Sequence, residues 1–181
     1  MLRYFTALPF AVPALAAGTI VSALVAKHIA RRIHERPVLV FLWLTSLALV
    51  LSATLTPSSH AIGLDEGLRT TRVWTWSLPS PGALSSVNWQ SMNLLLFAPP
   101  GFTSGLFTRR RHIARFGALA LLVSAIVEVV QFVVTPLGRA QFNSATVLIG
   151  WSGIAVGLLL GVLLSRLVQR IRLGEPRTKK N

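Results

Sequence analysis

The sequence predicts an all-α protein, namely a polytopic transmembrane helical bundle of about five spans. Hydrophobic residues make up 52% of the 181 residues and charged residues only 13%, whereas charged residues are about a quarter of an ordinary soluble domain. The hydrophobic residues are gathered in five long runs, and most basic residues lie in the polar segments between these runs. A chain of this length is expected to form a single domain, here embedded in a lipid bilayer.

Each apolar run is expected to form one helix. The runs cover residues 5–26, 37–56, 92–107, 116–134 and 147–168. Four of them approach the roughly 20 residues that a spanning helix requires. The third run is shorter and contains Pro99, Pro100 and Gly101, which predict a kink because each proline removes a backbone donor. The sequence leaves open whether neighbouring helices relax this kink or whether the helix is broken there and lines a site.

The first run has a second interpretation as a cleaved signal peptide. It follows the sequence MLR and contains the small-residue stretch ALAAG, which resembles a cleavage site. The run continues to Ala26, however, which is longer than the apolar region of about 7–15 residues in usual signal peptides. A retained helix is therefore favoured, and removal of residues 1–26 would leave four spans.

The basic residues predict how the helices are oriented. The net charge is +13, from 18 Lys and Arg against 5 Asp and Glu. If all five runs span the bilayer, 14 of the 18 basic residues fall on one side. The positive-inside rule then places that side, with the basic tail at 174–181, in the cytoplasm and the N-terminus outside. We expect these residues to fix the topology and to face anionic membrane lipids, and we do not expect nucleic-acid binding.

Residues 1–173 are therefore expected to form one transmembrane domain, followed by the tail. Its outer segment at 57–91 contains three Pro and three Gly, so we expect it to be mostly irregular. Trp74, Trp76 and Trp89 in this segment are expected at the depth of the lipid headgroups. The sequence contains no cysteine, no nucleotide-binding loop and no convincing set of metal ligands, so neither a cofactor nor a metal is expected.

Small residues in the last run predict close helix packing. Gly153, Gly157 and Gly161 are spaced four apart, which places them on one helix face where another backbone can approach. Packing against another helix of the same chain is the favoured interpretation. The alternative is a seam between two copies in a homo-oligomer.

The stretch SAIVEVVQF at residues 124–132 places polar side chains within an apolar run. Ser124, Glu128 and Gln131 are spaced four and three apart and therefore share one helical stripe. Apart from Arg166 near the end of the fifth run, Glu128 is the only charged residue within the five runs. A charge at the centre of a span costs about 3 kcal/mol on insertion scales, so Glu128 is expected to face the bundle interior.

Two further polar residues are expected at the depth of this stripe. Asn93 lies near the outer end of the third run, and Arg139 follows the fourth run in a short outer loop. One interpretation is an ion pair between Glu128 and Arg139 that holds this loop over the bundle. The other is an outward-facing polar pocket, because ionisable residues inside a membrane usually mark functional sites. This pocket would comprise Asn93, Ser124, Glu128, Gln131 and Arg139.

Three segments together resemble the VanZ-like family of bacterial membrane proteins. MNLLLFAPPGF at 92–102 is similar to the family's Asn-x-x-x-Phe-x-Pro-x-Gly segment, and SAIVEVVQF to its Ser-x-x-x-Glu-x-x-Gln helix. GRAQFNSATVLIGWSGIAVG at 138–157 is similar to the segment that enters the family's last helix. The resemblance covers roughly residues 40–168. The family's one or two aspartates after the arginine are absent, because positions 143–146 read Asn, Ser, Ala and Thr.

The resemblance implies a role in the cell envelope, at the bacterial cytoplasmic membrane, with low-level resistance to teicoplanin or a lipoglycopeptide as the expected phenotype. The expected ligand of the polar pocket is a lipid-linked cell-wall precursor or the drug itself. One alternative is an intramembrane enzyme that acts on an envelope lipid with Glu128 as general base. The other is a structural or assembly protein that associates through the glycine stripe. A binding protein is favoured over an enzyme because the sequence shows no second catalytic carboxylate and no activated nucleophile.

Overall fold

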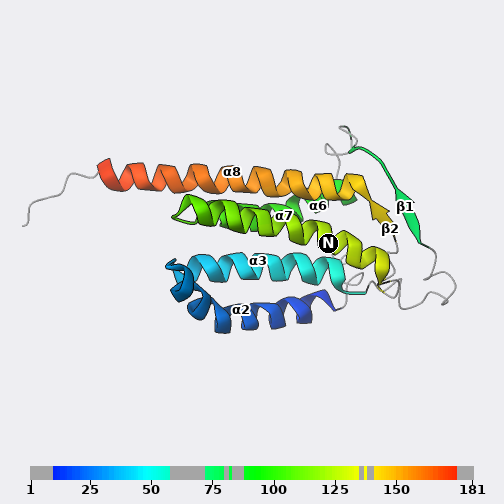
Figure 1. Ribbon diagram of the computed structural model, residues 1–181, viewed down its shortest axis with the longest axis horizontal. Coiled ribbons are helices and arrows are strands. Elements are labelled where there is room, and N and C mark those ends of the chain that lie inside the picture. The colour runs from blue at the N-terminus through cyan, green and yellow to red at the C-terminus, as the bar shows by residue number, and fades with distance from the viewer. Residues whose placement is uncertain are drawn as a thin grey trace, which may run out of the picture.

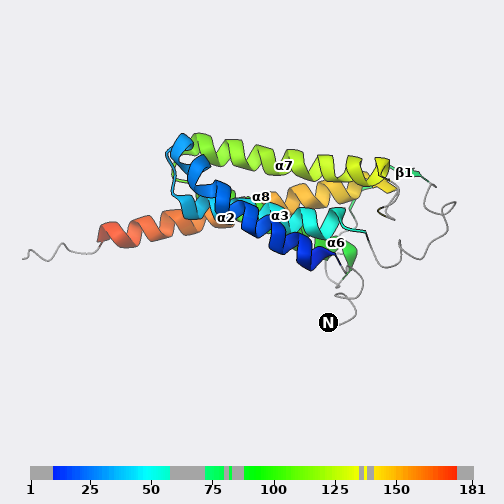
Figure 2. The same cartoon turned by 90° about the horizontal axis from the view of Figure 1, so that it is seen from below.

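The structure of the chain is a computed structural model. It describes residues 10–57, 72–79, 82, 88–134, 137 and 141–174. The helices and strands in these residues are α2 (Ala11–Ile33), α3 (Pro37–Leu55), β1 (Val73–Thr75), α6 (Trp89–Gly105), α7 (Arg110–Val133), β2 (Gln141–Asn143) and α8 (Ser144–Gly174). The helices lie side by side along the long axis of the molecule, and both strands lie at one end (Figure 1, Figure 2).

Within the described part of the chain, four helices are long and apolar enough to cross a membrane, namely α2, α3, α7 and α8. The predicted all-α bundle is therefore confirmed, and the four apolar helices indicate a multi-pass membrane protein. The remaining helix, α6, has 17 residues, which is about 25 Å at 1.5 Å per residue. It packs against α3, α7 and α8.

Several helices are longer than the apolar runs predict. α2 continues to Ile33 instead of ending at Ala26, and α8 continues to Gly174 instead of ending at Val168. The first and fifth apolar runs end shortly before Lys27 and Arg170, but arginine and lysine favour helices and extend their charged groups toward the membrane surface. The ends predicted from hydropathy are therefore too short.

α6 is a continuous helix across Pro99, Pro100 and Gly101, so the broken-helix alternative is wrong. Pro100 is fully buried, and a Cβ added at Gly101 would overlap the backbone of α8. The hydroxyl groups of Thr103 and Ser104 donate to the carbonyl oxygens of Pro99 and Pro100, at 2.9 and 2.7 Å respectively. α6 therefore continues through the two prolines, and Gly101 allows it to pack closely against α8.

The glycine stripe of α8, formed by Gly153, Gly157 and Gly161, lies directly against α6 of the same chain. A Cβ added at any of these positions would overlap a carbonyl oxygen of α6. These oxygens belong, in the same order, to Leu94, Ala98 and Phe102, so the two helices run parallel. The stripe is therefore occupied within the chain and is not available as a seam between two copies.

Two groups of buried side chains fill the space between the helices. Near the α2–α3 turn, Phe107 stacks on Phe116 with 4.4 Å between ring centroids, and Trp43 meets Phe116 edge-on at 4.8 Å. The indole N–H of Trp43 donates to Oγ of Ser104 at 3.0 Å, which joins α3 to α6. The second group lies farther along the bundle and comprises Val50, Phe97, Ala120 and Ile154.

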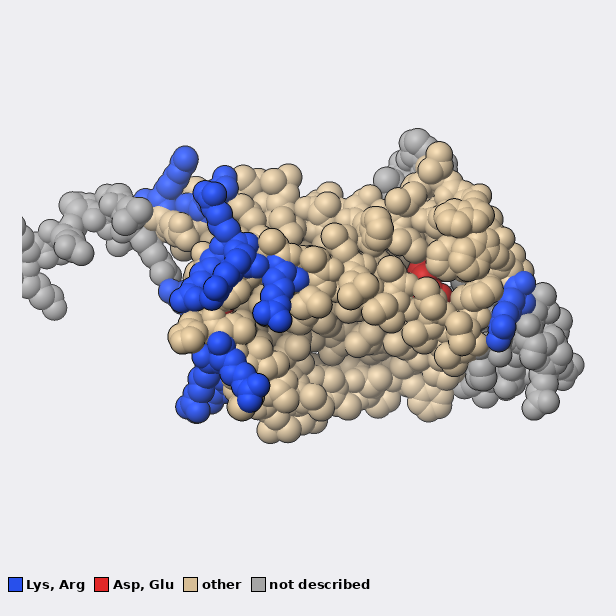
Figure 3. Space-filling view, viewed as in Figure 1, with Lys and Arg blue, Asp and Glu red and all other residues tan. Residues whose placement is uncertain are grey.

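The charged residues distinguish the two ends of the bundle. Lys and Arg side chains gather at one end, which we call the basic end (Figure 3). Its described basic residues, all exposed, are Lys27, Arg31, Arg32, Arg36, Arg109, Arg110, Arg111, Arg115, Arg166 and Arg170. The opposite end carries β1 and β2, and we call it the strand end. Its described basic residue is Arg72, so the predicted charge asymmetry is present in the structure.

β1 and β2 form a parallel pair in which Trp74 lies opposite Phe142. The sequence predicts mostly irregular structure at 57–91, and the short strand β1 within this segment is not predicted. Trp74 stacks on Phe142 at 4.0 Å and meets Phe132 of α7 edge-on at 5.4 Å. Trp74 and Trp76 are 51% and 74% exposed, as suits indole rings at headgroup depth.

Glu35 joins two turns at the basic end. Its covered carboxylate accepts hydrogen bonds from Thr108 Oγ1 and His112 Nδ1–H at 2.8 Å each, and from the backbone N–H of Arg109 at 3.3 Å. These donors lie at the N-terminus of α7, where the helix dipole favours a negative group. Burial raises the pKa of Glu35, but the hydrogen bonds from His112, Thr108 and Arg109 outweigh this effect and hold the pKa below its usual value. We call this set of bonds the Glu35 clamp.

Gly157→Ala is expected to destabilise the bundle by roughly 1–3 kcal/mol, because the added methyl group overlaps the backbone of α6. The Tm of the purified protein in detergent should fall accordingly. Val156→Ala, at a neighbouring position that is 48% exposed, is the control and should leave the Tm close to the wild-type value. Equal Tm values for all three proteins would contradict the α6–α8 contact.

Glu35→Gln is expected to lower stability at neutral pH, with a difference from wild type that shrinks in acid. Because the pKa of Glu35 is lowered in the folded state, its carboxylate stabilises the fold above the usual pKa of about 4.3. This contribution is lost as the pH falls through the lower folded value. Thermal unfolding at several values between about pH 3 and pH 7 measures the difference. A difference that is the same at every pH would contradict the clamp.

Candidate functional site

Ser124, Glu128 and Gln131 lie on the side of α7 that faces the other helices. Their exposed fractions are 1%, 6% and 8%, whereas Ile126 and Val129 on the same helix are about half exposed. The spacing of four and three residues therefore places the three polar side chains in the interior. In a spanning helix this keeps their polar atoms away from the lipid.

Gln131 supplies a hydrogen-bond donor to the C-terminal end of another helix. Its Nε2 donates to the backbone oxygen of Thr54 at 2.7 Å. Thr54 lies in the last turn of α3, and the final carbonyl groups of a helix have no donor within that helix. Gln131 thus caps α3 from α7. Thr54 could not be found from the sequence, because a backbone oxygen leaves no signal in residue type.

Ser124 lies where three helices meet. A Cβ added at Gly150 of α8 would lie 2.6 Å from Oγ of Ser124 and 3.2 Å from Cδ2 of Phe97 on α6. The three residues therefore mark one level in the bundle. Because α6 and α7 run in opposite directions, the strand end is reached toward lower numbers in α6 and toward higher numbers in α7.

Asn93 and Glu128 share a depth in the bundle. Each lies four residues from the level of Gly150 toward the strand end, or about 6 Å at 1.5 Å per residue. The side chain of Asn93 is half-buried. Arg139, the fifth residue of the predicted pocket, lies outside the described residues, so its ion pair with Glu128 remains a prediction.

Gln90 is a further polar residue at this end, and no motif in the sequence singles it out. It lies in the first turn of α6 and is 8% exposed, and its buried Oε1 has no hydrogen-bond partner within the described residues. It lies seven residues from Phe97, as Gln131 does from Ser124, so both amides are about 10 Å from the level of Gly150. A buried acceptor without a donor costs about 1–3 kcal/mol, so Oε1 of Gln90 is a site where a ligand's donor would be stabilised.

Asn143 and Ser144, where the predicted resemblance would place aspartates, lie at the junction of β2 and α8. The side chain of Asn143 accepts a hydrogen bond from the backbone N–H of Ala145 at 2.9 Å and another from Oγ of Ser77 at 2.7 Å. The hydroxyl of Ser144 donates to the backbone oxygen of Ser77 at 2.8 Å. The side chain of Asn143 therefore caps α8, and both side chains fasten the segment after β1 to this helix.

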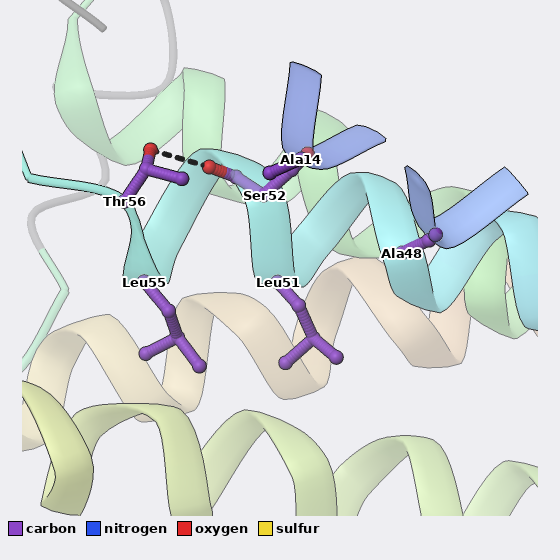
Figure 4. Close-up of a pocket in the computed structure, with 7 residues that line it drawn as sticks. Ala14, Ala48, Leu51, Ser52, Leu55 and Thr56 are labelled. Carbon is purple, nitrogen blue, oxygen red and sulfur yellow. Dashed lines mark hydrogen bonds between the residues drawn. The ribbon is translucent and has the colours of Figure 1, made fainter. Parts of the chain in front are cut away.

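An open groove of about 350 Å³ lies between α2 and α3, toward the strand end (Figure 4). It is lined by Ala14, Gly18, Ala48, Leu51, Ser52, Leu55 and Thr56. The hydroxyls of Ser52 and Thr56 donate to backbone oxygens of α3 at 2.9 and 2.6 Å. The groove is therefore largely apolar. It contains none of the five residues of the predicted polar pocket.

The fold defines the class of the protein as a helical bundle with the character of a multi-pass membrane protein. No family model, curated protein or solved structure matches the chain. The resemblance to the VanZ-like family therefore stays a prediction from the three sequence segments.

Gly150→Ala is expected to destabilise the protein, because its methyl group would meet Oγ of Ser124. In a Ser124→Ala background the same change should cost less, since the oxygen is gone. Thermal unfolding of the four proteins gives the coupling energy, expected to be about 1 kcal/mol. Purely additive effects would contradict the contact between Ser124 and Gly150.

Proposed function

We propose that the protein is a VanZ-like membrane protein of the bacterial cell envelope. In this proposal, a polar pocket at the strand end binds a lipid-linked cell-wall precursor or a glycopeptide, and gives low-level resistance to teicoplanin or a lipoglycopeptide. The observation that carries the proposal is the buried stripe of Ser124, Glu128 and Gln131 in an otherwise apolar helix. Ionisable groups in spanning helices are costly and are retained mainly where they function.

The chemistry of the pocket follows from its groups. Glu128 would accept hydrogen bonds from a ligand or exchange a proton with it. Arg139 would hold an anionic headgroup or carboxylate with two N–H donors. Asn93 would orient the ligand, and Oε1 of Gln90 would accept a hydroxyl or amide N–H, because it lacks a partner within the described residues.

The orientation in the membrane belongs to the same proposal. The ten exposed basic residues of the basic end support a cytoplasmic position for that end of the bundle. The C-terminal part of α8, which carries two of these residues, would lie there too. The strand end would then face outward in the bacterial cytoplasmic membrane, where cell-wall precursors and glycopeptides meet.

The two alternatives receive less support. An intramembrane enzyme with Glu128 as general base would gain from a second catalytic carboxylate nearby, and Glu35, the other described carboxylate, lies at the basic end. Assembly through the glycine stripe would require a free helix face, whereas α6 covers that stripe.

Glu128→Gln keeps the shape of the side chain and removes its charge. In a strain that lacks the gene, complementation with this variant should leave teicoplanin and lipoglycopeptide susceptibility at the level of the deletion strain, while wild type restores resistance. Val129→Ala, on the exposed face of the same helix, is the control and should complement fully. Membrane levels of each variant are measured by immunoblot. Full complementation by Glu128→Gln at normal expression would contradict the charged-pocket proposal.

A further inference from the structure

The basic end presents cations that no described acid balances. Ten basic side chains are exposed there, and the described carboxylate at this end is Glu35. Its side chain is covered and already bound by three donors in the Glu35 clamp. The exposed arginines of this end therefore remain open to an external anion.

The Glu35 clamp fixes where part of this charge lies. Arg36 directly follows Glu35 before α3, and Arg109 directly follows Thr108 before α7. The bonds from Thr108 Oγ1 and the N–H of Arg109 to Glu35, at 2.8 and 3.3 Å, hold the two turns side by side. The backbones of Arg36 and Arg109 are thereby brought close together. Two guanidinium groups from adjacent turns can both bond to one phosphate group, since each offers several N–H donors.

Apolar surface of α3 follows Arg36 directly and indicates what kind of anion the site takes. Val38 and Leu42, in the first turns of α3, are 64% and 40% exposed. The acyl chains of a lipid would cover this surface while its headgroup contacts the arginines. In a multi-pass membrane protein this surface lies against lipid acyl chains, so the anions nearest to the arginines are the headgroups of those lipids.

We propose that the clamped turns form a binding site for the phosphodiester headgroup of an anionic phospholipid, with Arg36 and Arg109 contacting the phosphate. The site lies at the opposite end from the polar pocket and does not depend on the function proposed for that pocket. Diffuse attraction to a negative membrane surface would treat all arginines of the basic end alike. A defined site depends on the pair that the clamp positions.

Lipid binding by the full chain in neutral detergent tests the proposal. Native mass spectrometry compares the binding of phosphatidylglycerol and of phosphatidylcholine with the same acyl chains. For Arg36→Gln/Arg109→Gln we expect the affinity for phosphatidylglycerol to fall by at least about tenfold, because both charge-assisted contacts to the phosphate are lost. Arg166→Gln/Arg170→Gln removes the same charge from α8 and leaves the clamped turns unchanged. It should change the affinity by less than about twofold, because charges that do not contact the headgroup are screened by salt. Equal losses in both proteins, or no loss in either, would overturn the proposal.

Glu35→Ala separates a defined site from diffuse attraction by the sign of its effect. The substitution makes the basic end more positive, so diffuse attraction predicts tighter binding of phosphatidylglycerol. Loss of the clamp releases the two turns, so a defined site predicts weaker binding. Tighter binding would overturn the proposal. If this variant does not fold, the arginine pairs decide, because their side chains are exposed.

Inorganic phosphate distinguishes a lipid headgroup from a soluble anion. Phosphatidylglycerol is expected to raise the Tm of the protein in phosphatidylcholine, and inorganic phosphate at the same concentration is expected to leave it unchanged. An equal rise with inorganic phosphate would overturn the assignment to a lipid.

Discussion

The backbone contact between α6 and α8 is the constraint on which the rest of the bundle depends. In lipid the hydrophobic effect does not drive helices together, so close van der Waals contact must hold them. Glycine at five positions of the two helices lets carbonyl oxygens approach where side chains would otherwise stand. The contact fixes the register of α6 along α8. As a result Asn88, which caps α6, and Ser144, which begins α8, both lie at the strand end.

Hydroxyl groups secure α6 on another side. Trp43 of α3 donates to Ser104, and Oγ of Ser46 lies 3.3 Å from Oγ1 of Thr103. Thr103 and Ser104 in turn bond to carbonyl oxygens of their own helix. Polar groups in the bilayer must be paired within the protein, and these pairs also fasten α3 to α6. A short helix with two prolines is thus held by α8 on one side and by α3 on another.

The features that repeat along a helix could be predicted from the sequence. Hydropathy predicted the number of helices among the described residues, and the three- and four-residue spacing of polar and glycine residues predicted the interior stripe of α7 and the glycine stripe of α8. The remaining features join segments far apart in the chain and leave no periodic trace. They include the cap that Gln131 provides for Thr54, the parallel strands, the buried amide of Gln90 and the bonds of Glu35. Helix ends were misplaced for a related reason, since hydropathy falls where basic residues follow an apolar run while the helical hydrogen bonds continue.

The parallel arrangement of α6 and α8 also constrains the order in which the chain can assemble. Consecutive helices usually pair with their chain neighbours through short connections. α7 lies between α6 and α8 in the sequence, so α6 cannot meet its glycine-lined partner until the last helix has entered the membrane. Until α8 has been made, the backbone surface of α6 that contacts α8 is uncovered. A chain that ends early within α8 would therefore lack part of this contact.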